Sequence, residues 1–278
     1  MNFDNEIGDI STRVDFSPLD CASVLITGGT GFVGNWVQMG LRAASLQGVK
    51  YGVNVLDRFG YRDWLLFGIN HYDYIFHLAP IFDVQTLKNI CDAYPKRVLF
   101  ASSGAVYHKE LNDYGRRKLM AENTLLLDAC GLDVVIARMF AFCGPYLRPD
   151  NFAVGNFVRN AWRGEPLRVF GKGDAVRSYM YGADLSVWLW KMMLHADAGS
   201  IYNVGSEEPI TILQLADKVK EIVNPAVSIE VMNDNFIERA PHYVPDTSKT
   251  RQELGVDERY GLEQQIIRYA EWMYEEMK

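Results

Sequence analysis

Along the first half of the chain, short runs of apolar and β-branched residues alternate with longer segments in which apolar residues recur at the period of a helix. The runs predict strands at 23–27, 52–57, 73–79, 97–103 and 133–140, and the longer segments predict helices at 33–46, 84–94 and 114–130. Strands that are apolar almost throughout, with helices between them, are typical of a parallel sheet covered on both faces. We therefore predict an α/β fold with a doubly wound, Rossmann-like parallel sheet.

The pattern changes after residue 141, where a stretch rich in Gly, Pro and Asn leads into shorter elements and a final helical segment at 262–278. We interpret residues 21–145 as one lobe and residues 146–278 as a smaller lobe, with residues 1–20 as an N-terminal arm of unassigned role. The segment 181–194 has the apolar spacing of a helix that packs on the first lobe. Part of 178–205 is therefore expected to return to that lobe.

The composition of the chain limits its partners. The chain has 28 Lys and Arg against 35 Asp and Glu, a formal net charge of -7, which argues against nonspecific binding to nucleic acid. The four cysteines have no paired spacing and the five histidines have no ligand spacing, so neither a disulfide framework nor a metal site is expected. No signal peptide or membrane span is evident in the sequence. We expect a soluble, cytoplasmic protein that would bind an anionic substrate through local arginines.

Three glycines, Gly28, Gly31 and Gly34, stand where the first predicted strand ends and the first predicted helix begins. This is the place where the pyrophosphate of a dinucleotide meets the positive end of a helix dipole. Gly28 permits a tight turn, Gly31 lets the backbone approach the phosphates, and Gly34 lets the helix pack closely on its strand. A tight structural turn without a ligand is the alternative interpretation.

Asp57, at the end of the second predicted strand, favours the dinucleotide interpretation, because an acid at this place accepts hydrogen bonds from an adenosine ribose. Asp57 would also repel a 2'-phosphate, whereas its neighbour Arg58 could bind one. We expect NAD rather than NADP as the cofactor.

Tyr114 and Lys118 stand at i and i+4 near the start of a predicted helix, so their side chains share one face. The same spacing recurs at Tyr274 and Lys278 without a strand and a serine before it, so the spacing alone has little meaning. Tyr114 is distinguished by Ser103, which ends a predicted strand shortly before it. We expect Tyr114 to take the proton of a hydroxyl group, with Ser103 hydrogen-bonded to the same oxygen and Lys118 supplying positive charge.

Five stretches, "TGGTGFVG", "HLAP", "SSGAVY", "YGRRK" and "RSYMYGADL", together resemble the extended short-chain dehydrogenase/reductase family, which contains nucleotide-sugar epimerases and dehydratases. The resemblance covers residues 22–278. It implies that residues 21–145 bind a dinucleotide and that Ser103, Tyr114 and Lys118 form a catalytic triad. The cofactor contacts that it implies are Gly28, Thr30, Gly31, Phe32, Val33, Gly34, Asp57, Arg58, Leu78, Ala79, Tyr114 and Lys118.

The resemblance also implies that the smaller lobe holds a nucleoside-diphosphate sugar. Arg177 matches an arginine that contacts the substrate diphosphate in such enzymes, and a guanidinium group can chelate phosphate oxygens. A surface arginine is the alternative interpretation. The substrate-binding residues that the resemblance implies are Ser103, Asn156, Arg177 and Arg239.

Two departures from the family concern binding. Ala141 stands where relatives have an asparagine, so one hydrogen bond to the substrate is expected to be lost. The interval from Asp57 to His77 is shorter than the family uses for its third strand, so a simplified adenine pocket is expected.

A third departure concerns chemistry. Gly104 and Ala105 follow Ser103 at positions where the sugar 4,6-dehydratases of the family have an acidic pair and the related decarboxylases also have an acid. Neither residue can exchange a proton, and the nearest carboxylates in sequence that could substitute are Glu110 and Asp113.

The expected protein is therefore an NAD-dependent nucleotide-sugar epimerase that oxidises a sugar hydroxyl to a ketone, lets the intermediate turn, and returns the hydride. The alternatives are a reductase of a 4-keto nucleotide sugar, a dehydratase, and a non-catalytic NAD(P)-binding regulator. Family members commonly dimerise through the helix that bears the tyrosine and lysine. Apolar residues on more than one face of 119–129 favour such a homodimer.

Overall fold

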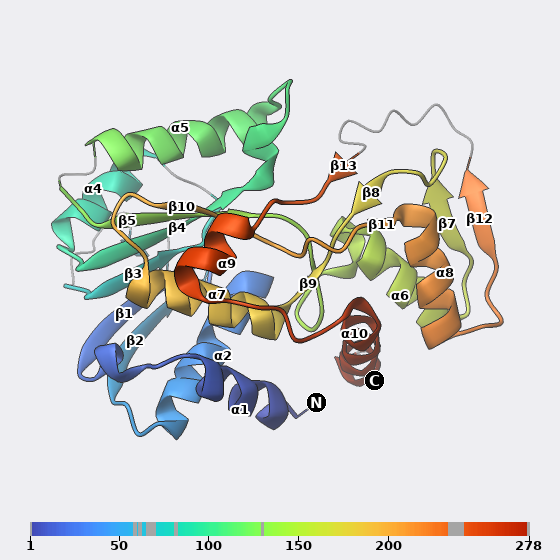
Figure 1. The fold of residues 1–278 in the computed structure, drawn as a ribbon, viewed down its shortest axis with the longest axis horizontal. Helices are drawn as coiled ribbons and strands as arrows, with labels where there is room; N and C mark the ends of the chain where they lie inside the picture. Colours follow the sequence, from blue (N-terminus) through green and yellow to red (C-terminus); the bar gives the residue numbers. More distant parts are fainter. Residues whose placement is uncertain are drawn as a thin grey trace.

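The structure is a computed structural model that describes residues 2–57, 60, 63–64, 71–80, 83–128, 131–232 and 242–276. It has a larger lobe built around a sheet and a smaller lobe beside it (Figure 1). The strands and helices expected from the hydrophobic pattern are found in the larger lobe, within one to three residues at most ends.

The central sheet has the strand order β10-β5-β4-β3-β1-β2, and each neighbouring pair is parallel. The predicted doubly wound α/β fold is therefore confirmed. The order along the chain reverses between β1 and β3, and ligands of open parallel sheets bind at such a point, outside the carboxyl ends of the strands. The strands are β1 (Ala22–Thr27), β2 (Tyr51–Leu56), β3 (Tyr74–His77), β4 (Arg97–Ser103), β5 (Val134–Met139) and β10 (Ile201–Val204).

Helices cover both faces of this sheet (Figure 1). On one face, Val24 and Ile26 of β1 join a buried cluster with α2 (Phe32–Leu46) and α7 (Gly182–His195). On the other face, Leu25 joins a second cluster with α4 (Val84–Asp92) and α5 (Asp113–Asp128). Alternate residues of a strand point to opposite faces, so strands covered on both sides must be apolar throughout.

The N-terminal segment, expected as an arm, forms a packed helix, α1 (Asp4–Arg13), which contacts α2 and α7 and is followed by the short helix η1 (Ser17–Leu19). Nη1 of Arg13 lies 2.6 Å from Oδ1 of the buried Asp184 on α7. The carboxylate of Glu6 accepts hydrogen bonds from Tyr181 (2.9 Å) and from Arg268 (2.6 Å), which lies on the last helix of the smaller lobe. Helix α1 therefore contacts both the larger lobe, through α7, and the last helix of the smaller lobe.

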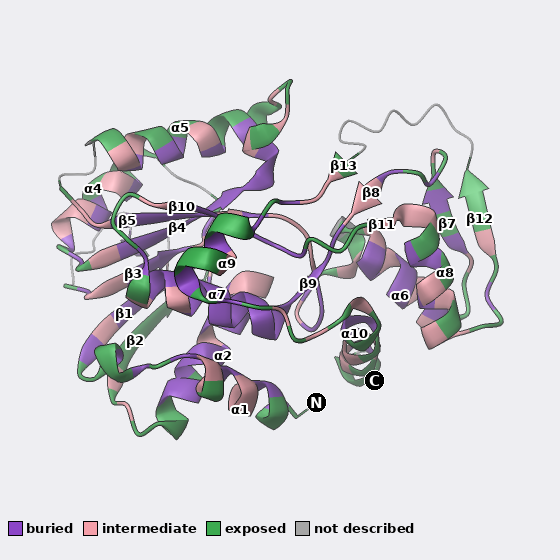
Figure 2. Cartoon of the chain, in the orientation of Figure 1, coloured by how far each residue is buried: buried purple, intermediate pink, exposed green. Residues whose placement is uncertain are grey.

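The smaller lobe has its own core, shown in purple in Figure 2, where Cys143, Leu215 and Ile266 are fully buried. Cys143 is thus a small buried apolar residue. The helices of this part are α6 (Ala153–Arg163), α8 (Ile212–Val223), α10 (Leu262–Glu276) and the short η3 (Pro149–Asn151), and its strands are β7 (Leu167–Phe170) with β12 (Ile229–Met232), β6 (Phe142–Cys143) with β9 (Met180–Tyr181), and β11 (Ile210–Thr211) with β8 (Val176–Arg177) and β13 (His242–Tyr243).

The chain passes between the lobes more than once. α7 and β10 lie in the larger lobe, within the segment expected to return there. A later helix, α9 (Ser248–Leu254), contacts both β10 and α7, so the chain returns a second time, which the hydrophobic pattern did not indicate.

Candidate functional site

A cavity of about 1440 Å³ lies between the two lobes and is lined by residues of both. Sites for one small molecule usually measure roughly 300–1,000 Å³, so this cavity has room for more than one ligand. Its lining includes the side chains of Phe32, Ser103, Tyr114, Lys118, Phe140, Asn156, Arg177 and Tyr243.

The glycine-rich turn lies at the carboxyl end of β1, where the strand order reverses. Gly28 has a φ of +70°, and a Cβ there would lie 2.9 Å from the amide nitrogen of Ala79. A Cβ on Gly34 would lie 2.4 Å from the Cα of Gly29. Gly31 is different, because a Cβ there would meet one protein atom, the Gly28 oxygen, at 3.4 Å, so the protein itself tolerates a side chain at this position.

Gly31 is also the N-cap of α2 and offers no side chain to cap the first turn of the helix. The first N–H groups of a helix have no partner within the helix, and they attract anions. The turn thus combines a close approach of backbone with the positive end of a helix, which fits the pyrophosphate of a dinucleotide.

The other residues expected to contact a cofactor surround this turn. Phe32, Val33 and Leu78 line the cavity, Ala79 lies buried beneath Gly28, and Thr30 is exposed. Asp57 is exposed at the end of β2, and its Oδ1 accepts a hydrogen bond from the amide of Gly60 (2.7 Å). Arg58 and Arg239 lie outside the described residues.

The strand end of β4 and the first turns of α5 bring Ser103, Tyr114 and Lys118 to the same cavity. Ser103 is buried, and its Oγ accepts a hydrogen bond from the amide of Ala105 (3.2 Å). Tyr114 is 43% exposed, so its hydroxyl group is open to a ligand. Lys118, one helical turn later, is 6% exposed.

Burial controls the charge of Lys118. Removal from water lowers the pKa of Lys118 to about 8, and the nearby carboxylate of Glu122 acts in the opposite direction. Nζ donates a hydrogen bond to the carbonyl oxygen of Ala101 (2.7 Å) and lies 4.8 Å from the centre of the Phe100 ring. Lys118 therefore carries its charge at neutral pH in a site with little water.

A buried ion pair lies behind these residues, and the sequence analysis did not find it. The carboxylate of Glu122 accepts hydrogen bonds from Ser102 and from Nη2 of Arg138 (2.6 Å). Arg138 in turn lies over the ring of Tyr107, 4.7 Å from its centre. The pair fixes α5 to the ends of β4 and β5, and therefore fixes Lys118 relative to Ser103.

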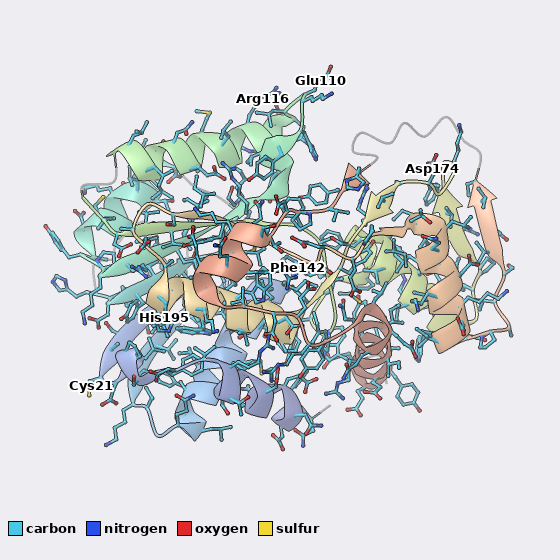
Figure 3. All side chains as sticks on the ribbon, viewed as in Figure 1. Cys21, Glu110, Arg116, Phe142, Asp174 and His195 are labelled. Atoms are coloured by element: carbon cyan, nitrogen blue, oxygen red, sulfur yellow. The ribbon has the colours of Figure 1, made fainter. Side chains whose placement is uncertain are left out.

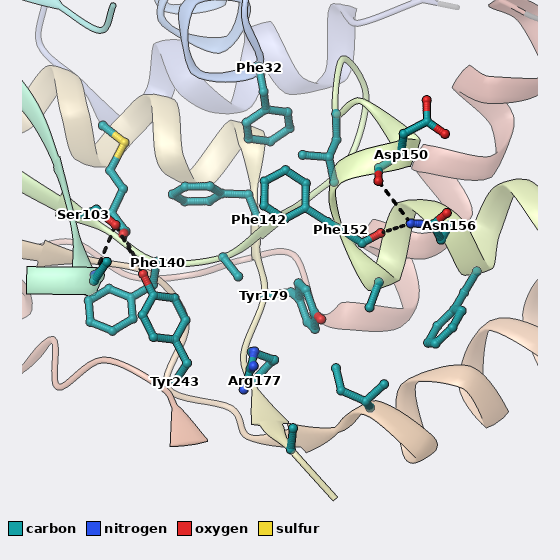
Figure 4. A pocket seen from close by; sticks show the side chains of 18 of the residues that line it. Phe32, Ser103, Phe140, Phe142, Asp150, Phe152, Asn156, Arg177, Tyr179 and Tyr243 are labelled. Carbon is teal, nitrogen blue, oxygen red and sulfur yellow. Dashed lines mark hydrogen bonds between the residues drawn. The ribbon is translucent and has the colours of Figure 1, made fainter. Parts of the chain in front are cut away.

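The far wall of the cavity belongs to the smaller lobe (Figure 4). Arg177 lines it from β8, and Nη1 of Arg177 donates a hydrogen bond to the carbonyl oxygen of Val176 (2.8 Å). Asn156 lines it from α6, where its Nδ2 donates to the carbonyl oxygen of Phe152 (3.2 Å) and its Oδ1 accepts from Nη2 of Arg159 (2.7 Å).

This wall is rich in positive charge. Its cations are Arg159, Arg168, Lys172 and Arg177, and its described carboxylates are Asp150 and Asp174. The sequence analysis identified Arg177 alone among these cations, because the others lie on segments without a recognisable motif. An anionic group binds favourably here although the whole chain is acidic.

The carboxylates among the described lining residues, Asp150 and Asp174, belong to the far wall and not to the wall formed by Ser103. Asp113 pairs with Arg116 (2.6 Å) at the surface, and Glu110 lies at the outer tip of the loop before α5, far from Phe142, which lies between the lobes (Figure 3). Neither lines the cavity, so the structure does not bring the expected substitutes for the missing acids to this place.

Within the described ranges, no group of three or more His, Cys, Asp or Glu side chains could hold a metal ion. Nor does any helix in the described part of the chain have the length and apolar character needed to cross a membrane.

The sequence is similar to a known protein family and to characterised enzymes. The model of a family described as the NAD dependent epimerase/dehydratase family matches residues 83–205. The chain is 29% identical to UDP-glucuronic acid decarboxylase 5 of Arabidopsis thaliana, over 86% of this chain and 85% of that protein.

Two solved structures share the fold. A UDP-glucose 4-epimerase of Thermotoga maritima, solved with UDP-glucose, aligns with a TM-score of 0.76 and 22% identity over 92% of this chain and 100% of that chain. The enzyme WbmF of Bordetella bronchiseptica, solved with NAD+, aligns with a TM-score of 0.76 and 20% identity over 94% of this chain and 95% of that chain.

Proposed function

We propose that this chain, which is similar to the NAD dependent epimerase/dehydratase family over residues 83–205, oxidises a hydroxyl group of a nucleoside-diphosphate sugar to a transient ketone and then restores the hydroxyl group with inverted configuration. The observation that carries the proposal is the single cavity that Ser103, Tyr114 and Lys118 share with a positively charged far wall. The glycine turn at the switch point of the sheet supports a dinucleotide beside them.

The cofactor is NAD, held by the turn from Gly28 to Gly34 together with Leu78 and Ala79. Bound NAD supplies the acceptor and donor of a hydride. Asp57 is exposed where β2 ends, so its carboxylate can accept hydrogen bonds from a ribose and repels a 2'-phosphate.

Tyr114 takes the proton of the sugar hydroxyl group, and Ser103 hydrogen-bonds the same oxygen. A free tyrosine has a pKa of about 10, so service as a base at neutral pH requires a shift of about three units, or about 4 kcal/mol. The positive charge of the buried Lys118 favours the phenolate of Tyr114.

The smaller lobe binds the nucleoside diphosphate. Arg177 and Asn156 line the same wall, and we expect Arg177 to contact the phosphates. Arg239 remains a candidate from the sequence for the same role. The UDP-glucose bound by the Thermotoga maritima relative supports a UDP-sugar as the first ligand to test.

Decarboxylation is the second candidate, because a plant UDP-glucuronic acid decarboxylase is similar to this chain over most of its length. Oxidation next to the carbon that bears a carboxylate gives a β-keto acid, which can lose carbon dioxide with the ketone as electron sink. Gly104 and Ala105 supply no acid beside Ser103, and the described lining there has no carboxylate. We therefore place epimerisation first.

Product analysis distinguishes these reactions. The protein would be incubated with NAD and with UDP-glucose or UDP-glucuronate, and the products followed by proton NMR. Inversion of one hydroxyl group supports the epimerase, whereas a pentose identifies a decarboxylase and a 4-keto-6-deoxy sugar a dehydratase. Stoichiometric oxidation of NADH by a 4-keto sugar would identify a reductase, and retention of NAD without any turnover would favour a regulator.

The assembly is proposed to be a homodimer formed through α5. Its buried face packs on the sheet through Ala121 and Leu125, whereas Met120 is 68% exposed and Leu127 is 82% exposed. Apolar residues on both faces favour a helix that packs on two sides. Cys21 and Cys143 form no disulfide within the described part of the chain, and a reducing compartment such as the cytoplasm is proposed on the scattered spacing of the cysteines in the sequence.

A further inference from the structure

Tyr243 reaches the site from the smaller lobe and was not singled out in the sequence. Its strand, β13, pairs with β8 so that Tyr243 lies opposite Arg177. The ring lies on that of Phe140, with centroids 4.7 Å apart, and edge-on to that of His108, at 5.7 Å. Contacts on two sides fix the position of the ring while its edge lines the cavity.

The hydroxyl group of Tyr243 is directed towards Ser103 (Figure 4). Its oxygen lies 3.5 Å from Oγ of Ser103 and 3.5 Å from the carbonyl oxygen of Met139. Burial raises the pKa of Tyr243, so the phenol keeps its proton at neutral pH. Both distances are long for an O–H···O hydrogen bond, so the hydroxyl group can turn to a better acceptor placed beside Ser103.

Tyr243 also lies between the two ends of the expected substrate. The guanidinium carbon of Arg177 is 6.0 Å from the centre of the Tyr243 ring, whereas the hydroxyl group of the same side chain contacts Ser103. If the diphosphate binds at Arg177 and the reacting hydroxyl group lies at Ser103, the sugar ring between them must lie next to Tyr243. Ala141, which lines the same cavity, has no polar side-chain atom to offer such a sugar.

We propose that Tyr243 is a substrate-positioning residue that donates a hydrogen bond to the sugar beside the hydroxyl group engaged by Ser103 and Tyr114. This inference rests on the proposed function. Because Tyr243 belongs to the smaller lobe and Ser103 to the larger one, the contact links binding of the diphosphate to alignment of the sugar at the base.

The test compares Tyr243→Phe with a matched control, Tyr107→Phe. The ring of Tyr107 also stacks on Phe140, at 6.4 Å, but its hydroxyl group donates to Oδ1 of Asn203 (3.0 Å), outside the cavity lining. Each variant would be titrated by calorimetry with UDP and with UDP-glucose, and kcat and KM measured with whichever of UDP-glucose and UDP-glucuronate turns over faster.

For Tyr243→Phe we expect kcat/KM to fall about 10-fold and the affinity for UDP-glucose to weaken, since one hydrogen bond contributes about that much. The affinity for UDP alone should stay within about 2-fold, because the phosphates contact Arg177 and not the hydroxyl group. Tyr107→Phe should match the wild type. Equal losses for UDP and UDP-glucose would indicate a general structural role and overturn the proposal, as would wild-type affinity for UDP-glucose.

Tyr114→Phe separates this inference from the proposed function. If Tyr114→Phe is inactive and Tyr243→Phe is normal, the positioning role fails and the proposed function stands. If Tyr114→Phe keeps its activity, or if the wild type turns over neither sugar, the proposed function fails, and the calorimetric comparison of UDP-glucose with UDP still decides whether Tyr243 contacts the sugar.

Discussion

Replacing Lys118 with methionine tests the idea that this site holds a buried charge at the expense of stability. Methionine has a similar length and no charge, so it can occupy the space of the lysine stem. Lys118→Met should remove catalytic turnover, because the positive charge beside Tyr114 is lost. The same variant should make the cofactor-free protein more stable at pH 7.

The magnitude follows from the shift in pKa. Burial lowers the pKa of Lys118 from 10.5 to about 8, and a shift of about 2.5 units corresponds to about 3 kcal/mol of destabilisation when the group is charged. Loss of the hydrogen bond from Nζ to Ala101 and of the contact with Phe100 costs about 1–2 kcal/mol. We therefore expect a net gain of about 1–2 kcal/mol at pH 7.

The lowered pKa of Lys118 also fixes the direction in which the unfolding free energy changes with pH. Between about pH 8 and pH 10.5 the unfolded chain holds the proton of Lys118 and the folded chain has released it. The unfolded state then binds more protons, so the unfolding free energy of the wild type rises with pH, by about 2 kcal/mol from about pH 7 to 9.5. Lys118→Met lacks this contribution, so its advantage should disappear over that range.

Urea denaturation of both proteins at the two pH values measures the difference, with equal m-values as the control for a common unfolded state. Taking the difference between variants cancels the titration of other groups. A variant that is less stable at pH 7 would refute the reasoning, and so would a stability difference that does not change with pH.

The remaining predictions concern the base, the cofactor turn, the substrate arginine and the dimer. Tyr114→Phe should reduce turnover about 100-fold or more without weakening NAD binding, and near-full activity in a steady-state assay would exclude Tyr114 as the base. Gly28→Ala should abolish NAD binding in calorimetry, whereas Gly199→Ala, with a φ of +75° and no atom within 4 Å of the added Cβ, should retain it; equal effects would point to backbone strain alone. Arg177→Met should raise KM for UDP-glucose about 10-fold or more and leave NAD affinity unchanged, and an unaltered KM would contradict its role at the diphosphate. Leu127→Lys should convert a dimer into a monomer in light scattering, and a monomeric wild type at micromolar concentration would rule the dimer out.

Much of the site could be predicted because its signals are local. The apolar runs and helical periods depend on near neighbours, so they gave the parallel sheet and the ends of its strands. Gly28 and Gly34 leave a signal in the sequence because a Cβ at either place would collide with backbone. Ser103 and Tyr114 are close in sequence, so one strand end and one helix start suffice to bring them together.

The role of residues 1–20 and the wall of the substrate cavity had no such signal. α1 depends on ion pairs such as that of Arg13 with Asp184, whose partners are far apart in the chain. Tyr243 meets Ser103 only because β13 pairs with β8 and the smaller lobe closes on the larger one.

The sequence by itself therefore determined the order of the elements, the glycine turn and the chemical groups available for catalysis. Tertiary structure alone decided that Lys118 loses water, that Glu122 pairs with Arg138 behind it, and that Glu110 stays outside the cavity. The physical reason is the distance along the chain over which each feature is determined. A turn or an amphipathic helix is specified by residues within a few positions, whereas burial, and with it a pKa, depends on every segment that packs around a side chain.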